Sequence, residues 1–175
     1  MADSLWVMCL LLFVDGATFS FATTPLLLHY GKIHTEPTWI AILGGASSAA
    51  GSAIQLLILR RLLASSHPYM RRFAPSRDKV ESAVKSYPAA SFAALVLARA
   101  TPLPDAPLKL VAAAAGYPAG RYALAIFIGA LPYYFALALA GRKFQPPTWV
   151  IFAATAAIAI GVIVDRLRRR GRDAE

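Results

Sequence analysis

Apolar residues along this chain fall into five long blocks separated by short polar or proline-containing segments. The blocks cover residues 5–30, 38–63, 89–116, 122–140 and 148–164. Several of them reach the roughly 17–25 residues that an α-helix needs to cross a bilayer. The second and fourth blocks are continuous, and we expect transmembrane helices over 38–63 and 121–141. The fifth block predicts a third transmembrane helix over 147–165.

The third block is interrupted in its middle by charges and prolines. Arg99, Asp105 and Lys109 each carry a charge that costs roughly 2.5–3.5 kcal/mol at a bilayer centre on insertion scales. Between them stand three prolines, each of which removes a backbone donor and prevents a straight helix from continuing; they are Pro102, Pro104 and Pro107. Such a segment is tolerated at membrane depth only where it is buried in protein or lines a wet cavity. The segment 99–109 is therefore a candidate functional site.

Composition places the whole chain, residues 1–175, in one all-α polytopic membrane domain. Of 175 residues, 58% are hydrophobic and 15% are charged, and the mean hydropathy is +0.54. A soluble domain averages about 45–50% apolar and about 25% charged residues. The net charge of +9 does not indicate nucleic-acid binding, because the basic residues flank apolar blocks as they do at a membrane surface.

The positions of the basic clusters predict the topology. One cluster follows the second block, and the other follows the fifth; they are Arg60, Arg61, Arg71, Arg72, Arg77, Lys79 and Lys85, and Arg166, Arg168, Arg169, Arg170 and Arg172. Both clusters should be cytoplasmic, so an even number of crossings must separate them. Three blocks intervene, and the broken one is the block that should not cross. We therefore expect residues 89–120 to form a re-entrant helical hairpin with its tip at 99–109.

The first block has the same character. Pro25 interrupts it, and Asp15 is an intramembrane carboxylate. We expect residues 5–30 to form a second re-entrant hairpin that dips from the opposite face, which makes hairpin plus crossing helix an inverted repeat, an architecture typical of transporters. The same tripeptide, Thr-Pro-Leu, occurs at both expected tips, as Thr24-Pro25-Leu26 and as Thr101-Pro102-Leu103. A shared tripeptide is weak evidence for a repeat. A spanning helix or a cleaved signal peptide is the alternative, but Asp3 and the lack of Lys or Arg before the apolar run disfavour cleavage.

The remaining segments fit a membrane surface and close helix packing. Residues 64–88 should form an amphipathic linker on an anionic leaflet, and residues 166–175 a basic cytoplasmic tail. Gly45 and Gly51 belong to a small-residue run that permits close helix contact. The lone Cys9 and three scattered histidines give no ligand spacing, so we expect no metal and no cofactor.

The residue types at the broken segment suit a phosphate. Arg99 offers a bidentate guanidinium fork and Lys109 a point charge, and a helix that starts after Pro104 or Pro107 would direct backbone donors at an anion. Asp15 and Asp105 could balance these cations or exchange protons. Two structural alternatives stay open: Arg99 and Asp105 could form an internal ion pair, and Asp15 could be a helix cap.

The segment also resembles a known family. The matching features are the arginine, the Pro-x-Pro step, a small-residue return limb and a later basic-aromatic step; they lie at Arg99, Pro102, Pro104, Lys109, Gly116, Arg121, Phe127 and Gly129. This pattern resembles a small bacterial branch of the DedA/VTT superfamily, also described as SNARE-associated. Asp15 followed by Pro25 is similar to the acidic residue before the first hairpin of that family. The resemblance spans roughly residues 10–145.

The resemblance implies translocation of phospholipid or polyprenyl-phosphate headgroups between leaflets, as by a scramblase or flippase, with Arg99, Lys109, Thr101 and Arg121 binding the lipid phosphate. It also implies a multi-pass protein of the bacterial inner membrane. The chain departs from many members at Leu26 and Leu27, where an acidic residue is common, and at Asp105, where a second arginine is common. These departures argue against proton coupling of the kind inferred for those members, and Lys109 could supply the missing positive charge.

Other functions remain alternatives. A proton- or ion-coupled transporter of a small solute would use Asp15 and Asp105, and a membrane scaffold would use the polar segments only for packing. We expect no enzyme, since the chain has no Ser/His/Asp set and no phosphate-binding glycine loop. The expected partners are membrane lipids and an anionic leaflet, with a homo-oligomer possible.

Overall fold

The computed structural model describes residues 4–18, 22–33, 36–65, 91–101 and 106–145, together with single positions at 78, 80, 81, 147, 149, 150, 153 and 156. Six helices and no strands occupy the continuous part of this description. They are α1 (Leu5–Ala17), α2 (Thr23–Ile33), α3 (Pro37–Ala64), α6 (Phe92–Ala100), α7 (Ala106–Ala114) and α8 (Ala119–Phe144). The predicted linker 64–88, third transmembrane helix 147–165 and basic tail 166–175 lie largely or wholly outside the described residues.

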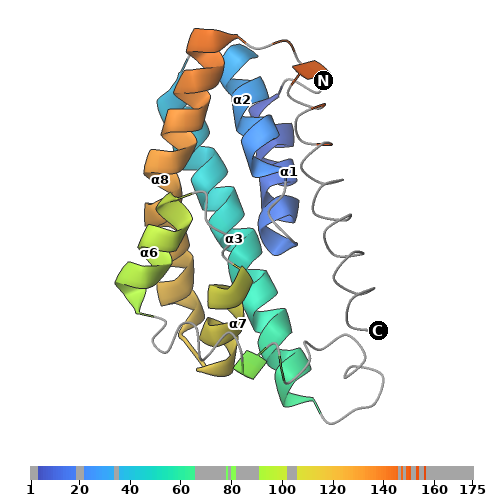
Figure 1. Ribbon diagram of the computed structural model, residues 1–175, viewed down its shortest axis with the longest axis vertical. Helices are drawn as coiled ribbons and strands as arrows, with labels where there is room; N and C mark the ends of the chain where they lie inside the picture. The colour runs from blue at the N-terminus through green and yellow to red at the C-terminus, as the bar shows by residue number, and fades with distance from the viewer. Residues whose placement is uncertain are drawn as a thin grey trace, which may run out of the picture.

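Two long antiparallel helices form the centre of the molecule (Figure 1). α3 has 28 residues and α8 has 26, which gives lengths of about 40 Å at 1.5 Å per residue. Both are long and apolar enough to cross a membrane. They correspond to the transmembrane helices predicted over 38–63 and 121–141.

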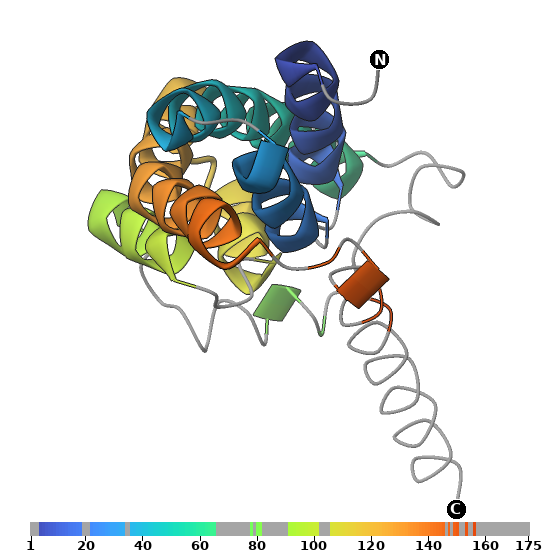
Figure 2. The same ribbon diagram turned by 90° about the horizontal axis from the view of Figure 1, so that it is seen from above.

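Two short helical hairpins flank this pair from opposite ends. We use the name first hairpin for the consecutive short helices α1 and α2, and the name second hairpin for α6 and α7. Figure 1 shows the first hairpin along the upper half of the α3–α8 pair and the second along the lower half. The end of α1 and the end of α6 lie near mid-height, and we call the facing helix ends of each hairpin its tip. Figure 2 shows α1 and α6 at opposite sides of the pair. Each of the four helices has 9 to 13 residues, so none alone spans the roughly 30 Å hydrocarbon core.

Glycines bring the hairpins into backbone contact with the long helices. A Cβ built at Gly51 of α3 would lie 2.1 Å from the carbonyl oxygen of Phe13 in α1, and one at Gly129 of α8 would lie 2.5 Å from that of Val96 in α6. Such distances leave no room for a side chain, as at small-residue contacts in membrane proteins. Gly45 makes only an ordinary van der Waals contact, with Phe127 of α8.

Gly51→Ala should therefore destabilise the protein even though alanine is the better helix former. The added methyl group would overlap the Phe13 carbonyl, and overpacking of this kind costs about 1–3 kcal/mol. Gly120→Ala is the matched control, because nothing lies within 4 Å of a Cβ there. Thermal unfolding in detergent should show a lower midpoint for Gly51→Ala and an unchanged or slightly higher one for Gly120→Ala. Equal midpoints would mean that the α1–α3 contact is not close-packed.

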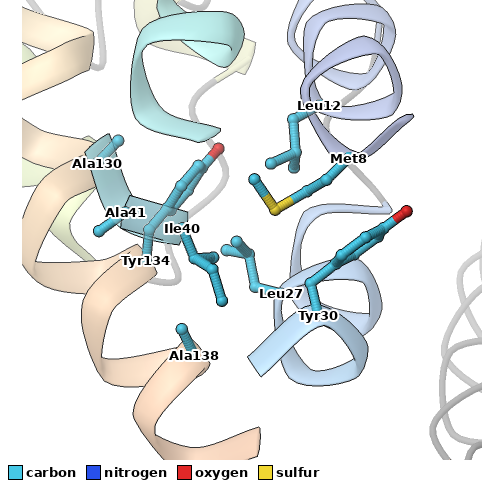
Figure 3. Close-up of a cluster of buried hydrophobic side chains, with 9 residues drawn as sticks. All are labelled: Met8, Leu12, Leu27, Tyr30, Ile40, Ala41, Ala130, Tyr134 and Ala138. Atoms are coloured by element: carbon cyan, nitrogen blue, oxygen red, sulfur yellow. The ribbon is translucent and has the colours of Figure 1, made fainter. Parts of the chain in front are cut away.

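Buried side chains form two apolar clusters, one for each end of the molecule. The first joins α1, α2, α3 and α8 and is drawn in Figure 3; its members are Met8, Leu12, Leu27, Tyr30, Ile40, Ala41, Ala130, Tyr134 and Ala138. The second joins α3, α6, α7 and α8 around Leu56, Leu95, Leu108 and Tyr122. The two hairpin tips lie between these clusters.

Candidate functional site

Polar side chains of α3 face both hairpin tips. Ser48, Ser52 and Gln55 follow one another at spacings of four and three residues, so they lie on one side of the helix. Ser52 Oγ donates to the carbonyl oxygen of Gly16 at 3.2 Å, near the end of α1. Ser48 and Gln55 each contact the second hairpin, as described next. α3 therefore presents a polar stripe at the level where the two tips meet.

Arg99, at the end of α6, extends into the space between α3 and α8. Its side chain is only 8% exposed. Nη2 donates to Ser48 Oγ at 2.6 Å and to the hydroxyl oxygen of Tyr134 at 2.5 Å, and Cζ lies 5.5 Å from the centre of the Tyr134 ring. These hydroxyls and the ring face offset part of the cost of burying a guanidinium group. Gly129 makes this position possible, because a Cβ there would lie 2.8 Å from the Arg99 Cβ.

Lys109, in the first turns of α7, is the second buried cation, at 4% exposure. Its Nζ donates to Gln55 Oε1 at 3.0 Å. Gln55 Nε2 in turn donates to the carbonyl oxygen of Thr18 at 2.5 Å, at the C-terminal end of α1. The Gln55 amide thus joins the second hairpin to the first.

Asp15 closes the tip of the first hairpin. Its Oδ1 accepts from the backbone N–H of Ala22 at 2.8 Å, and its Oδ2 accepts from the hydroxyl of Thr23. These groups stand at the N-terminal end of α2, where unsatisfied donors and the helix dipole favour a carboxylate. This geometry gives Asp15 a structural role at the start of α2, in line with the cap alternative. Charge balance or proton exchange by Asp15 stays a prediction.

The site lies at the middle of both long helices. Ser48 is within about 4 Å of the midpoint of α3 along the axis, and Tyr134 is equally near that of α8. Two cations, Arg99 and Lys109, and one carboxylate, Asp15, are buried among the described residues. Among the described residues, the buried cations therefore outnumber the buried carboxylates by two to one.

The other residues predicted from the sequence occupy varied positions. Thr101 is exposed at the end of α6, where its Oγ1 donates to the carbonyl oxygens of Leu97 at 3.1 Å and Ala98 at 3.2 Å. Arg121 is exposed in the first turn of α8, thirteen residues or about 20 Å along the axis from Tyr134. The structure thus brings Arg99 and Lys109 to the stripe of α3 and leaves Arg121 at one end of the molecule.

Among the described residues, the predicted helix breaks lie at the ends of helices. Pro25 is buried in the first turn of α2, and Pro107 is the second residue of α7, both favourable positions for proline. Gly116 has φ +66° and ends α7, with Tyr117 N donating to Ala112 O at 2.9 Å as in a Schellman motif. Pro102, Pro104 and Asp105 lie outside the described residues, and so does the proposed Arg99–Asp105 ion pair.

Sequence reasoning missed three residues that contact the buried cations: Ser48, Gln55 and Tyr134. The first two carried a signal, since polar groups recur on one face of an otherwise apolar helix. That run was interpreted only as small-residue packing. Tyr134 carried none, because an aromatic residue in an apolar helix is as expected in a core as in a site.

The family model of the VTT domain matches residues 10–143 of the chain. The chain belongs to the VTT domain family. The match begins within α1 and ends one residue before the end of α8. It therefore includes most of the first hairpin, the second hairpin, both long helices almost entirely, and all the buried polar residues described above. No curated protein and no solved structure matches the chain significantly.

Proposed function

We propose that this VTT domain protein moves phosphate-bearing lipid headgroups between the two leaflets, without catalysing a reaction. The observation that carries the proposal is the burial of Arg99 and Lys109 at mid-length of two helices long enough to cross a membrane. A lipid that crosses between the leaflets carries its phosphate past the middle of the membrane. An arginine at that level is suited to hold the phosphate through two parallel hydrogen bonds. The two buried cations against one carboxylate among the described residues favour an anion over a cation as substrate.

We further propose that both hairpins are re-entrant and related as an inverted repeat. Corresponding helices pack alike: α1 on α3 and α6 on α8, each through a glycine, Gly51 or Gly129. The first limbs also end alike, because Thr18 Oγ1 donates to Val14 O and Asp15 O just as Thr101 Oγ1 donates to the carbonyls four and three residues before it. Thr18 is thus the counterpart of Thr101. Thr24 lies in the first turn of α2, so under this proposal the two Thr-Pro-Leu tripeptides do not occupy corresponding positions.

The re-entrant arrangement makes a prediction about topology. If the second hairpin enters and leaves on one side and two helices cross after it, residues 65–87 and the C-terminal tail should both face the cytoplasm. Accessibility of single cysteines to a membrane-impermeant reagent, in a Cys9→Ser background, measures this. Finding the two segments on opposite faces would contradict the re-entrant hairpin.

A small-solute transporter receives less support from the described residues. Such a mechanism would use the carboxylates of Asp15 and Asp105 for coupling. Both oxygens of Asp15 already accept hydrogen bonds at the start of α2, and Asp105 lies outside the described residues. A passive scaffold would explain the glycine contacts. It leaves the two buried cations, Arg99 and Lys109, without a role, although burying a charge costs free energy even when the charge is partnered.

Reconstitution into vesicles tests the proposal. With a fluorescent phospholipid in both leaflets and a membrane-impermeant quencher outside, protein-free vesicles should lose only the outer-leaflet signal. Vesicles with the protein should lose nearly all of it. A pH-sensitive dye trapped in the same vesicles reports proton movement. Wild-type protein that leaves the inner leaflet protected would reject lipid translocation, and solute-dependent proton movement in its place would favour the transporter alternative.

A further inference from the structure

The amide of Gln55 occupies the position between the two hairpins that a substrate would need. It accepts from Lys109 Nζ at 3.0 Å and donates to the carbonyl oxygen of Thr18 at 2.5 Å. One side chain of a crossing helix thereby holds the start of α7 and the end of α1 together. Lys109 is 4% exposed in this arrangement, so a phosphate group cannot reach its ammonium while the described geometry persists.

We propose that Gln55 is a positioning residue that keeps the two hairpin tips closed and acts as a placeholder for the phosphate oxygen at Lys109. Entry of a headgroup then exchanges the Gln55 amide oxygen for a phosphate oxygen and frees the Thr18 carbonyl, so the tips separate as the anion binds. The inference rests on the proposed function and names the residue that regulates its site.

The two halves of the amide have separable roles. Gln55→Leu keeps much of the side-chain volume and removes both hydrogen bonds. Gln55→Glu keeps an acceptor for Lys109 and strengthens it to an ion pair, but it replaces the donor to the Thr18 carbonyl with a repelling oxygen. The leucine variant should therefore remove the amide oxygen that competes with phosphate for Lys109 Nζ, whereas the glutamate variant should hold Lys109 more tightly than the wild type does.

Ser52→Ala is the matched control. It removes a hydrogen bond from the same face of α3 to the same hairpin, at the Gly16 carbonyl, and leaves the Lys109–Gln55–Thr18 connection intact. A loss of stability common to all α3 variants would affect it as well.

The first measurement is the distance between spin labels at the two tips. Cysteines at Thr18 and Thr101, in a Cys9→Ser background of the full chain, carry the labels, and the protein is kept in a maltoside detergent that lacks phosphate. The wild type and Ser52→Ala should give one narrow distribution, and Gln55→Leu and Gln55→Glu a broader one shifted to longer distances. A distribution unchanged in both Gln55 variants would overturn the proposal, as would equal broadening in Ser52→Ala.

Adding a ligand to the labelled wild type tests the placeholder role. Phosphatidylglycerol should broaden the distribution, and galactosyl diacylglycerol, which has no phosphate, should not. Broadening by inorganic phosphate at the same concentration would assign the site to free phosphate, and broadening by the lipid alone assigns it to a headgroup. Equal effects of both lipids would overturn the exchange at Lys109.

The second measurement is the rate of lipid translocation in vesicles. Gln55→Leu should be about tenfold faster, as expected for the loss of one hydrogen bond to a charged group, and Gln55→Glu should be slower than the wild type. A merely structural residue would give a loss in both variants, and that outcome would reject the proposal. If no variant translocates lipid but the tip distances change as expected, the proposed function fails and the closure by Gln55 stands.

Discussion

Replacing Arg99 with alanine should abolish lipid translocation while the protein still inserts in the membrane. Arg99 is the one arginine that is buried among the described residues. Its guanidinium group donates hydrogen bonds to Ser48 Oγ and to the Tyr134 hydroxyl. Arg99→Lys keeps the charge but cannot form two parallel hydrogen bonds to a phosphate, so we expect a rate at least tenfold lower. The vesicle assay measures both. Arg61→Ala, which removes an exposed arginine near the end of α3, should translocate lipid as the wild type does.

A structural ion pair between Arg99 and Asp105 predicts a different pattern. If the arginine only neutralises that carboxylate, Arg99→Gln should be inactive and Arg99→Gln/Asp105→Asn should recover, because removing both charges avoids an uncompensated one. If Arg99 binds phosphate, the double variant should stay inactive. Full activity of the double variant would therefore reject the phosphate-binding role of Arg99.

Substitutions of Asp15 should distinguish its structural role at the start of α2 from a role in proton coupling. Asp15→Ala removes the acceptor for the Ala22 N–H and the Thr23 hydroxyl, and leaving such groups unsatisfied inside a protein costs about 1–3 kcal/mol each. Its unfolding midpoint should fall by several degrees. Asp15→Asn can accept from Ala22 N–H through Oδ1 and donate to Thr23 Oγ1 through Nδ2, so its stability should remain near that of the wild type.

Translocation by Asp15→Asn then decides between the two roles. We expect it to stay close to the wild-type rate, because asparagine preserves the cap of α2. A folded but inactive Asp15→Asn would show instead that the charge or the proton of this carboxylate is needed, and the coupled-transport alternative would gain the support it now lacks.

The sequence predicted the long helices closely because their apolar runs are uninterrupted. α3 and α8 extend the predicted transmembrane ranges by only one to three residues at each end. Breaks were also predictable where a single residue imposes them: Pro25 and Pro107 stand in first turns, and Gly116 adopts a positive φ that other residues avoid.

The contacts across the fold were not predictable in the same way. That Arg99 meets Ser48 and Tyr134 depends on how a short helix lies against two long ones, which no local pattern encodes. The close contacts illustrate the same limit: of the glycines in the run 44–51, Gly51 meets a backbone carbonyl of α1 and Gly45 meets only a side chain. The choice between them is set by the crossing of α1 over α3.

Photo-crosslinking from the lipid headgroup tests the central claim most directly. A phospholipid with a photoreactive group beside its phosphate, incorporated with the full chain in vesicles and activated by light, marks the residues that headgroups approach. If headgroups pass the buried cations, mass spectrometry should find crosslinks on peptides containing Ser48–Gln55 and Arg99–Lys109, and the crosslinks should be lost in Arg99→Ala. Crosslinks confined to the ends of α3 and α8, with none at mid-length, would contradict a lipid path through this VTT domain.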